Sequence, residues 1–489
     1  MENNSNIKEK SLQNTDNQEV KEENENIFTN QSQEEIFDKI LESVERVNFR
    51  SLAGEKFSQD DTKKLEQKHY VVIVTEYVLK KAEMLGYRLA KNNGNTYVFN
   101  GNYWVQISES LLETLLGECA LKMGLDPLES KFFRFRENLS KQFFSCADLS
   151  KPKNSKDKVL INLQNGTFEV TTQKQELRPF DDADFLRYQL PFSFTPNAKS
   201  PLFQTYLDKV LPEKDLQDIL AEYIGYVFVK NLKLEKVLLL YGSGANGKSV
   251  FFEVICEMLG RENVSNFSFS SLSNESYRSN IGDKLLNYGS ELKGTMDSDI
   301  FKQLASGEPV GAKRLYKDPY VMYDYAKLMF NANELPKDVE HNEAYFRRFL
   351  LIPFLVTIPR EERDPNLPKK IIKNELSGVF NWVLSGLNRL LDKKGFTGST
   401  TSQTFLEKYK NESDTVFMFL EENNYKACYD GKYTELSTIY PQYKQHYVSF
   451  GYFPLNLKNF INRLESNGLK TKRMNFGNVV LASKDIINL

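Results

Sequence analysis

A glycine-rich octet, GSGANGKS at residues 242–249, is the part of the sequence whose residue types and spacing most directly predict chemistry. It matches the pattern GxxxxGK[ST], in which a glycine-rich loop and a lysine hold nucleotide phosphates. A glycine-rich turn that binds no nucleotide is the alternative, and the flanking sequence argues against it. The predicted cofactor-binding residues are Gly242, Ser243, Gly244, Ala245, Asn246, Gly247, Lys248 and Ser249.

Each part of the octet has a chemical reason. Glycines let backbone N–H groups turn inward around phosphate oxygens, and the start of a following helix adds a favourable dipole. Lys248 is expected to pair with the β and γ phosphates. The Ser249 hydroxyl is expected to ligate Mg²⁺, which prefers oxygen donors. ATP and Mg²⁺ are therefore the predicted cofactors.

The segments on either side of the octet have the character needed to position it. Residues 237–241, VLLLY, form a short apolar run that predicts a buried strand. Residues 250–259 place their apolar side chains in one broad stripe, as an amphipathic helix does. The octet therefore lies between a strand and a helix.

Hydrolysis of a bound nucleotide also needs a carboxylate that orients water and completes the metal site. Residues 284–292, KLLNYGSEL, predict a short strand that ends in Glu291, a candidate catalytic acid and metal ligand. P-loop ATPases usually carry two acids at such a position, whereas Ser290 precedes Glu291 here. Which group orients the metal and which polarises water stays open, and an exposed glutamate at a strand end is the alternative.

Amide and guanidinium groups follow further along the chain. Residues 326–336 predict a strand that ends near Asn333, whose amide can hydrogen-bond a γ-phosphate or the attacking water, although asparagine is also common in turns. Arg347 and Arg348 precede another apolar strand. An arginine finger must reach a neighbouring subunit's γ-phosphate, and a solvated charged surface is the alternative for this pair.

The ordered segments YGSGANGKS, LNYGSEL, FKQLASGEPVGAKRLYKDP, LMFNANELP and YFRRFLLIPF resemble the superfamily 3 helicases of the poxvirus and phage primase-helicase type, over roughly residues 155–400. The resemblance implies an AAA+ motor that forms a homo-hexameric ring, hydrolyses ATP at subunit interfaces and translocates on DNA. It also implies roles for four residues. Glu291 is the acid, Asn333 the sensor, Arg348 the first choice for the finger and Arg347 the second.

Members of that family carry a DNA-gripping hairpin between the acid and the sensor. The matching stretch here is SGEPVGAKRLYKDPYVMY, with Gly311 expected at the turn. Basic side chains would contact single-strand phosphates, and Tyr316 and Tyr320 could stack on bases. An ordinary basic surface turn is the alternative. The predicted contacts are Lys313, Arg314 and Lys317.

The whole chain is predicted to be an α/β protein with a P-loop AAA+ ATPase core and a helical collar. Its expected parts are a disordered polar tail over 1–60, an α+β domain over 61–154, a helical pre-motor segment over 155–232, the motor over 233–400 and a winged-helix-like DNA-binding domain over 401–489. Residues 61–154 offer no Cys/His zinc set and no acidic pair at strand ends, so a primase is not expected there.

The expected C-terminal domain rests on an order of helix, helix and hairpin. Residues 456–467 predict a helix with one apolar face, which leaves polar and basic residues free to enter a major groove of duplex DNA. A structural cap with a solvated basic face is the alternative. The predicted duplex contacts are Lys458, Arg463, Lys472 and Arg473.

Composition excludes several classes of protein. The 489 residues carry a formal net charge of -2, so any nucleic-acid surface must be local. The 4 cysteines are far apart with no CxxC, which disfavours a zinc finger or a disulfide framework. The N-terminus lacks an apolar signal region and no run is long enough to span a membrane. A cytoplasmic protein without a membrane partner is expected.

These observations predict an ATP-dependent DNA helicase of a phage or mobile-element replication module, with single- and double-stranded DNA as partners. An ATP-driven DNA loader or remodeller that does not unwind DNA shares every motif. A non-enzymatic origin-binding protein that uses its P-loop only for assembly is a third possibility, because a single acid precedes Lys293.

Overall fold

The computed structural model describes residues 32–60, 62–92, 94–149, 158–171, 173–290, 292, 296–336, 341–428, 431–449 and 454–484. The chain divides into two compact units, Met1–Pro196 and Asn197–Leu489.

The first unit starts with helices where the sequence predicted part of a tail. Ser32 and Glu35 form a reciprocal capping box at the start of α2, and the apolar face of α2, including Ile36 and Ile40, is buried in the unit's core. The predicted tail over 1–60 is therefore wrong for residues 33–58, because a few well-spaced apolar side chains suffice once a core receives them. The helices are α2 (Gln33–Ser43), α3 (Phe49–Leu52), α4 (Glu55–Ser58), α5 (Gln67–Met84), α6 (Glu109–Lys122), α7 (Pro127–Lys131) and α8 (Phe133–Cys146).

Two antiparallel sheets complete the first unit. One contains β1 (Arg88–Asn92), β2 (Asn95–Phe99) and β3 (Trp104–Ile107), and the other contains β4 (Lys158–Leu163), β5 (Gly166–Thr171) and β6 (Gln175–Arg178). The 3₁₀ turn η1 (Asp182–Asp184) follows β6. The segment 155–232 was predicted to be helical, and its first part is instead this second sheet, in which β4 pairs antiparallel with β5.

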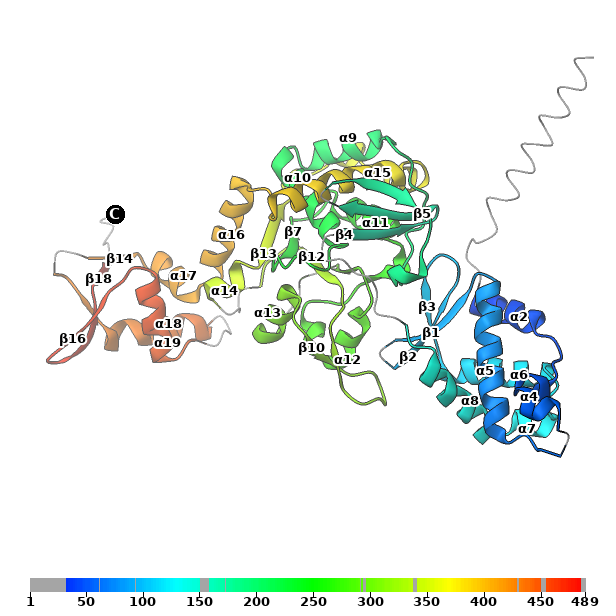
Figure 1. Ribbon diagram of the computed structural model, residues 1–489. Helices are drawn as coiled ribbons and strands as arrows, with labels where there is room; N and C mark the ends of the chain where they lie inside the picture. The colour runs from blue at the N-terminus through cyan, green and yellow to red at the C-terminus, as the bar shows by residue number, and fades with distance from the viewer. Residues whose placement is uncertain are drawn as a thin grey trace, which may run out of the picture. The chain divides into compact units, whose positions relative to one another are not determined.

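The second unit is built around a five-stranded parallel sheet with the order β13-β7-β12-β9-β8 (Figure 1). Its strands are β7 (Val237–Tyr241), β8 (Val264–Ser265), β9 (Leu286–Gly289), β12 (Lys327–Ala332) and β13 (Phe349–Pro353). β12 lies between β7 and β9, although it follows both in the sequence. The carboxyl ends of β12 and β13 therefore flank the end of β7, from which the glycine-rich octet leaves the sheet.

Helices pack around this sheet. α10 (Lys214–Tyr226) runs along α15 (Leu367–Lys393), and α9 (Pro201–Val210) and α11 (Lys248–Leu259) contact the same long helix (Figure 1). The shorter elements are η2 (Arg261–Asn263), η3 (Ser270–Ser273), α12 (Glu275–Arg278), η4 (Ser279–Ile281), α13 (Ser298–Ser306), β10 (Val310–Ala312), β11 (Tyr320–Met322), α14 (Glu343–Phe346) and η5 (Arg360–Glu362).

The C-terminal part of the second unit has its own core, in which Phe419, Tyr443 and Phe460 are buried. β15, β17 and β16 form a three-stranded antiparallel sheet, and β14 pairs with β18. The elements are α16 (Thr400–Glu412), α17 (Thr415–Glu422), β14 (Tyr425–Ala427), β15 (Thr434–Glu435), α18 (Leu436–Ser449), α19 (Leu457–Ser466), β16 (Thr471–Met474), β17 (Gly477–Val480) and β18 (Ala482–Lys484).

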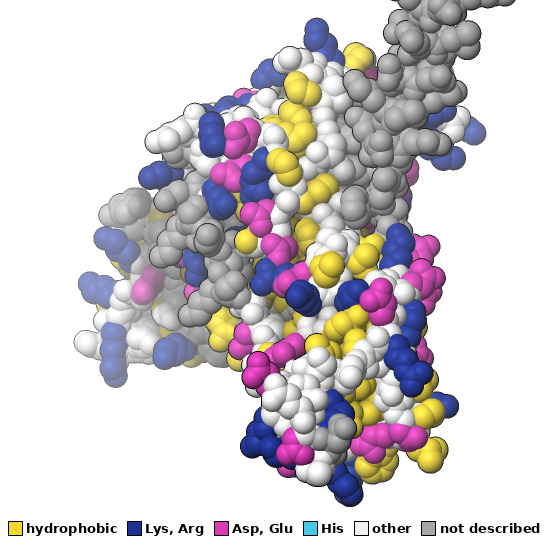
Figure 2. Space-filling view, turned by 45° about the vertical axis from the view of Figure 1, so that its right-hand side comes forward, with side chains coloured by type: hydrophobic (Ala, Val, Ile, Leu, Met, Phe, Trp, Pro, Cys, Tyr) yellow, Lys and Arg dark blue, Asp and Glu magenta, His cyan; other side chains and the backbone are white. Residues whose placement is uncertain are grey.

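Figure 2 shows basic and acidic side chains interspersed over the described surface of one face. Among the residues that the structure describes, no helix combines the length and apolarity that a membrane crossing requires. The same residues contain no cluster of three or more His, Cys, Asp or Glu side chains arranged to hold a metal ion.

Candidate functional site

The glycine-rich octet forms a tight loop between β7 and α11, as the sequence predicted. A Cβ atom on Gly242 would lie 2.0 Å from Asn246 Nδ2 and 2.7 Å from the carbonyl oxygen of Phe354, so only glycine fits. Gly247 has a φ of 86°, and a Cβ there would meet Val210 at 2.8 Å. Both glycines are therefore required by close packing of the loop.

Neutral hydrogen bonds hold the loop from two sides. Asn246 Nδ2 donates to the carbonyl oxygen of Phe354 at 3.0 Å, just beyond β13. The Tyr206 hydroxyl, on α9, donates to the carbonyl oxygen of Gly247 at 2.8 Å, and burial raises the pKa of that hydroxyl. Sequence reasoning missed Tyr206, because nothing in the local pattern of α9 marks it as a neighbour of the octet.

Lys248 is a buried cation with neutral acceptors. Its Nζ donates to the carbonyl oxygen of Gly242 at 2.6 Å and to Asn246 Oδ1 at 3.1 Å. Burial lowers the pKa of the Lys248 ammonium group, which shows that the charged form is poorly solvated here. A desolvated ammonium group with only neutral acceptors gains strongly from an anion. This charge is suited to a phosphate.

The start of α11 adds backbone N–H groups beside that ammonium group. Gly247 is the N-cap of the helix and supplies no side-chain cap. First-turn N–H groups of a helix lack intrahelical partners, and the helix dipole favours negative charge there. The Ser249 side chain lies exposed on this turn. The loop thus combines a cation, backbone donors and a hydroxyl oxygen.

The end of β12 lies directly beside the loop. The Gly242 N–H donates to the carbonyl oxygen of Ala332 at 3.0 Å, so the exposed Asn333 follows the residue bonded to the octet. Asn331 Oδ1 instead accepts from the buried Tyr288 hydroxyl at 3.0 Å. Of the two asparagines, Asn333 is the one whose side chain is free to face a ligand.

The predicted acid, Glu291, lies outside the described residues. Its neighbour Leu292 is described, and the Leu292 N–H donates to the carbonyl oxygen of Asn331 at 2.7 Å. The chain just after β9 therefore continues beside the end of β12.

Arg347 and Arg348 lie at the amino ends of the strands, opposite the end that carries the glycine-rich loop. The Val237 N–H, at the start of β7, donates to the carbonyl oxygen of Arg348 at 2.7 Å. Because β7 and β13 are parallel, the loop at the end of β7 lies about 16 Å away along a five-residue strand. Neither arginine is placed to act on the loop of its own chain.

Their environments differ sharply. Arg348 is 7% exposed, and its guanidinium donates to Ser306 Oγ at 3.1 Å and pairs with Glu235 at 3.1 Å. The side chain of Arg347 is 56% exposed and pairs with Glu235 at 3.3 Å. Arg348 is thus held inside the subunit and Arg347 is accessible.

Two family models match the chain. Residues 72–212 match a family described as D5 N terminal like, and residues 240–348 match a family of unknown function (DUF5906). A curated protein of Acanthamoeba polyphaga mimivirus, described as "Putative helicase L207/L206", is 21% identical over 378 residues. The alignment covers 68% of this chain and 39% of the mimivirus protein, so the chain spans well under half of that relative. These matches point to a D5-like family.

Solved structures of the NrS-1 C-terminal region in its apo form also resemble the chain. One has a TM-score of 0.45 and 11% identity, and covers 86% of this chain and 100% of that one. Another has a TM-score of 0.46 and 12% identity, and covers 85% and 100%.

The predicted nucleic-acid hairpin is present as β10 and β11. Its turn lies at residues 313–319, and Gly311 belongs to β10, which corrects its predicted place at the turn. Lys313, Arg314 and Lys317 are all exposed. Tyr316 is 96% exposed, and the Arg314 guanidinium lies 5.9 Å from the Tyr320 ring centroid. The tip therefore presents basic and aromatic groups together.

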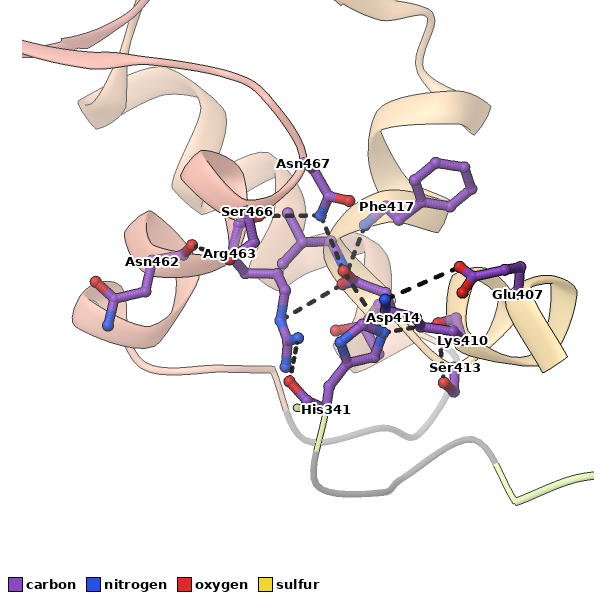
Figure 3. A network of polar contacts seen from close by, with 12 residues as sticks. His341, Glu407, Lys410, Ser413, Asp414, Phe417, Asn462, Arg463, Ser466 and Asn467 are labelled. Carbon is purple, nitrogen blue, oxygen red and sulfur yellow. Dashed lines mark hydrogen bonds and ion pairs between the residues drawn. The ribbon is translucent and has the colours of Figure 1, made fainter. Parts of the chain in front are cut away.

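The C-terminal helix α19 is joined to the segment that leads into α14 and the two arginines (Figure 3). Arg463 Nη1 donates to the carbonyl oxygen of His341 at 2.8 Å, and Arg463 Nε lies 3.8 Å from Asp414 Oδ1. Asn467 Nδ2 donates to Asp414 Oδ2 at 2.9 Å. Burial lowers the pKa of His341, whose Nε2 lies 2.7 Å from the carbonyl oxygen of Lys410. We refer to His341, Asp414, Arg463 and Asn467 as the junction network.

The junction network corrects one predicted DNA contact. Arg463 was expected to face outward from α19, but its side chain is only 19% exposed and is engaged within the unit. A helix of this length has more than one polar face, and the sequence pattern does not tell which face a neighbouring subdomain will cover. Lys458, Lys472 and Arg473 are exposed, as predicted.

Proposed function

We propose that the protein is an ATP-hydrolysing DNA helicase that acts in the replication of a phage or mobile genetic element. The observation that carries this proposal is the buried Lys248 in a glycine loop between a parallel strand and a helix, with the end of β12 beside it. The D5 N terminal like match and the mimivirus relative support a replication helicase or primase type of function.

The loop residues fit a nucleotide and its metal ion. Lys248 and the first N–H groups of α11 would bind the β and γ phosphates, and Tyr206 and Asn246 would keep the loop in shape. The hard oxygen donor of Ser249 fits Mg²⁺, which takes its remaining ligands from phosphate and water. When bound, the ion neutralises charge that develops on the phosphates during hydrolysis.

Two residues are proposed to act on the attacking water. Asn333 follows the end of β12 beside the loop, which suits an amide that contacts the γ-phosphate or the water. Glu291, which follows β9 in the sequence, is proposed as the acid and as a metal ligand. A positioned carboxylate takes a proton from water and so lowers the barrier to attack.

The geometry of the arginines favours Arg347 as the finger, in place of Arg348. A finger has to reach the γ-phosphate held by another subunit, and a buried guanidinium tied to Ser306 and Glu235 would first have to break those contacts. Arg347 is accessible and lies far from its own loop. This placement suits catalysis in trans within a ring, and a homo-hexamer is the proposed assembly.

Two surfaces are proposed to bind DNA. The tip of the β10–β11 hairpin would contact a single strand through Lys313, Arg314 and Lys317. The C-terminal elements α18, α19 and the β15-β17-β16 sheet follow the order of a winged helix and would form a second DNA-binding surface.

DNA-stimulated ATP turnover together with strand displacement on a forked substrate tests the proposal. We expect both activities in the wild-type protein and neither in Lys248→Ala. ATP turnover without strand displacement would favour a loader or remodeller. Nucleotide binding without turnover would favour an origin-binding protein.

The hairpin contribution can be tested separately. Lys313→Ala combined with Arg314→Ala is expected to keep basal turnover, lose DNA stimulation and reduce the slope of log affinity against log salt by about 1.4 on single-stranded DNA. Lys302→Ala, on the nearby helix α13, is a matched control that removes one charge outside the hairpin. An unchanged salt slope in the double variant would show that these residues do not touch phosphates.

A further inference from the structure

Two aromatic side chains are exposed together in the C-terminal part of the second unit. Phe476 is 59% exposed and Tyr433 is 44% exposed. Their ring centroids lie 5.9 Å apart with an interplanar angle of 35°. Phe476 occupies the two-residue turn between β16 and β17, and Tyr433 immediately precedes β15. We call Tyr433 and Phe476 the aromatic pair.

Burial in the local core does not explain the aromatic pair. The core of this part of the chain is formed by other side chains, among them Val480 in β17 and Phe460 in α19. Large aromatic rings left in water forgo the free energy that burial provides. An exposed pair beside a turn thus suits a ligand with a flat apolar face.

Basic groups lie next to the aromatic pair. Lys472 and Arg473 are exposed in β16, and Arg473 is directly opposite Asn478 on β17. Two acids lie near these cations: Glu435 in β15 is paired with Val479, the same β17 residue that pairs with Lys472, and Glu465 accepts a hydrogen bond from Thr471. The hairpin therefore combines two cations with flat rings, a chemistry that suits phosphates with bases attached.

The neighbouring helix is less available than the hairpin. The junction network ties Arg463 and Asn467, in and just after the last turn of α19, to Asp414 and to the His341 carbonyl oxygen. The β16–β17 hairpin extends outward past α18 and α19 (Figure 1). The hairpin is therefore an accessible basic element in this part of the chain.

We propose that the aromatic pair is a stacking platform for unpaired nucleobases, with Lys472 and Arg473 contacting the phosphates on either side. The proposal rests on DNA binding in the proposed function and specifies what this surface binds. Bases stack on aromatic side chains without sequence preference, and basic side chains track the backbone. The hairpin would thus hold the unpaired arm of a fork, while duplex contact falls to other residues.

The test uses the full chain and a forked DNA that carries 2-aminopurine in its single-stranded arm. Stacking on the aromatic pair should quench the fluorescence of that base in the wild-type complex. Phe476→Ala combined with Tyr433→Ala should abolish the quenching and weaken fork binding about tenfold, since stacking contributes ~1–3 kcal/mol per base. The salt slope of binding should stay unchanged, because no phosphate contact is lost.

Three variants serve as controls. Phe476→Trp should keep the quenching, because the larger ring still stacks. Lys472→Ala with Arg473→Ala should reduce the salt slope by about 1.4 while the bound complex still quenches. Phe133→Ala removes another exposed ring, in the first unit, and should change neither measurement.

The failures of the two proposals can be told apart. A wild-type protein that binds no DNA would overturn the proposed function together with this inference. DNA binding with full quenching in the double alanine variant would overturn the stacking platform alone. A drop in salt slope for the double alanine variant would also overturn it, since the loss would then be electrostatic.

Discussion

Positively charged side chains have different partners at the two ends of the parallel strands. At the carboxyl ends of the strands, the Lys248 ammonium group donates to a carbonyl oxygen and to an amide oxygen. At the amino ends, Arg347 and Arg348 both pair with Glu235. The buried cation has only neutral acceptors where an anionic ligand is proposed to bind, whereas the two guanidinium groups share one carboxylate.

Loss of Lys248 is expected to have the largest effect at the carboxyl ends of the strands. Lys248→Ala should reduce ATP turnover to background and remove the increase in melting temperature that ATP gives, because the phosphate-pairing charge is gone. Stability without nucleotide should not fall, since a desolvated charge is removed. Turnover assays and thermal melting with and without ATP provide the measurement.

Lys209→Ala is the matched control for that variant. Lys209 forms a surface ion pair with Glu362 close to the loop, and such pairs contribute little. Substantial turnover in Lys248→Ala would contradict the assignment of the loop.

Assemblies of wild-type and variant subunits test the proposed role of Arg347. Subunits that carry Arg347→Ala are expected to inhibit wild-type subunits more than in proportion to their share, because each defective finger silences a neighbour's site. ATP turnover measured across mixing ratios distinguishes this from a linear decline. A linear decline would indicate that each subunit hydrolyses ATP alone.

The free energy of unfolding is expected to respond differently to loss of Arg347 and to loss of Arg348. Arg348→Ala should lower the free energy of unfolding by about 2 kcal/mol, because it removes a buried guanidinium and leaves Glu235 and Ser306 without it. Arg347→Ala should change that free energy by less than ~0.5 kcal/mol, as exposed pairs do. Urea unfolding of both variants gives the comparison, and equal losses would mean that burial does not distinguish them.

An effect that depends on pH is expected for Lys327, at the amino end of β12. Burial lowers the pKa of Lys327 to about 8, and its Nζ lies 4.2 Å from the Tyr226 ring centroid. The unfolded chain, with a lysine pKa of about 10.4, binds the extra proton between these values. Stability should therefore rise as pH increases from about 8 to about 10.4, by on the order of 3 kcal/mol.

Lys327→Met isolates that contribution from other groups that titrate in the same range. The difference in unfolding free energy between wild type and variant should shrink as the pH rises. A difference that stays constant across the range would show that Lys327 keeps its ordinary pKa in the folded protein.

Predictions from the sequence succeeded where the signal is local. The octet, its strand and α11 are contiguous, so composition and spacing were enough to place them. The predicted tail was wrong over 33–58 and the predicted helical segment was wrong over β4 to β6, because a core or a partner strand decides how those residues fold. Glu291 stays a prediction.

What the sequence alone determined is the chemistry of contiguous segments: the glycine loop, the basic hairpin and the apolar face of α19. What only the tertiary structure decided is which distant groups meet them. Tyr206 at the loop, Glu235 at the arginines and His341 at Arg463 are each far away in sequence. Backbone preferences and side-chain periodicity act over a few residues, whereas burial and pairing depend on packing between segments whose order in space the sequence pattern does not state.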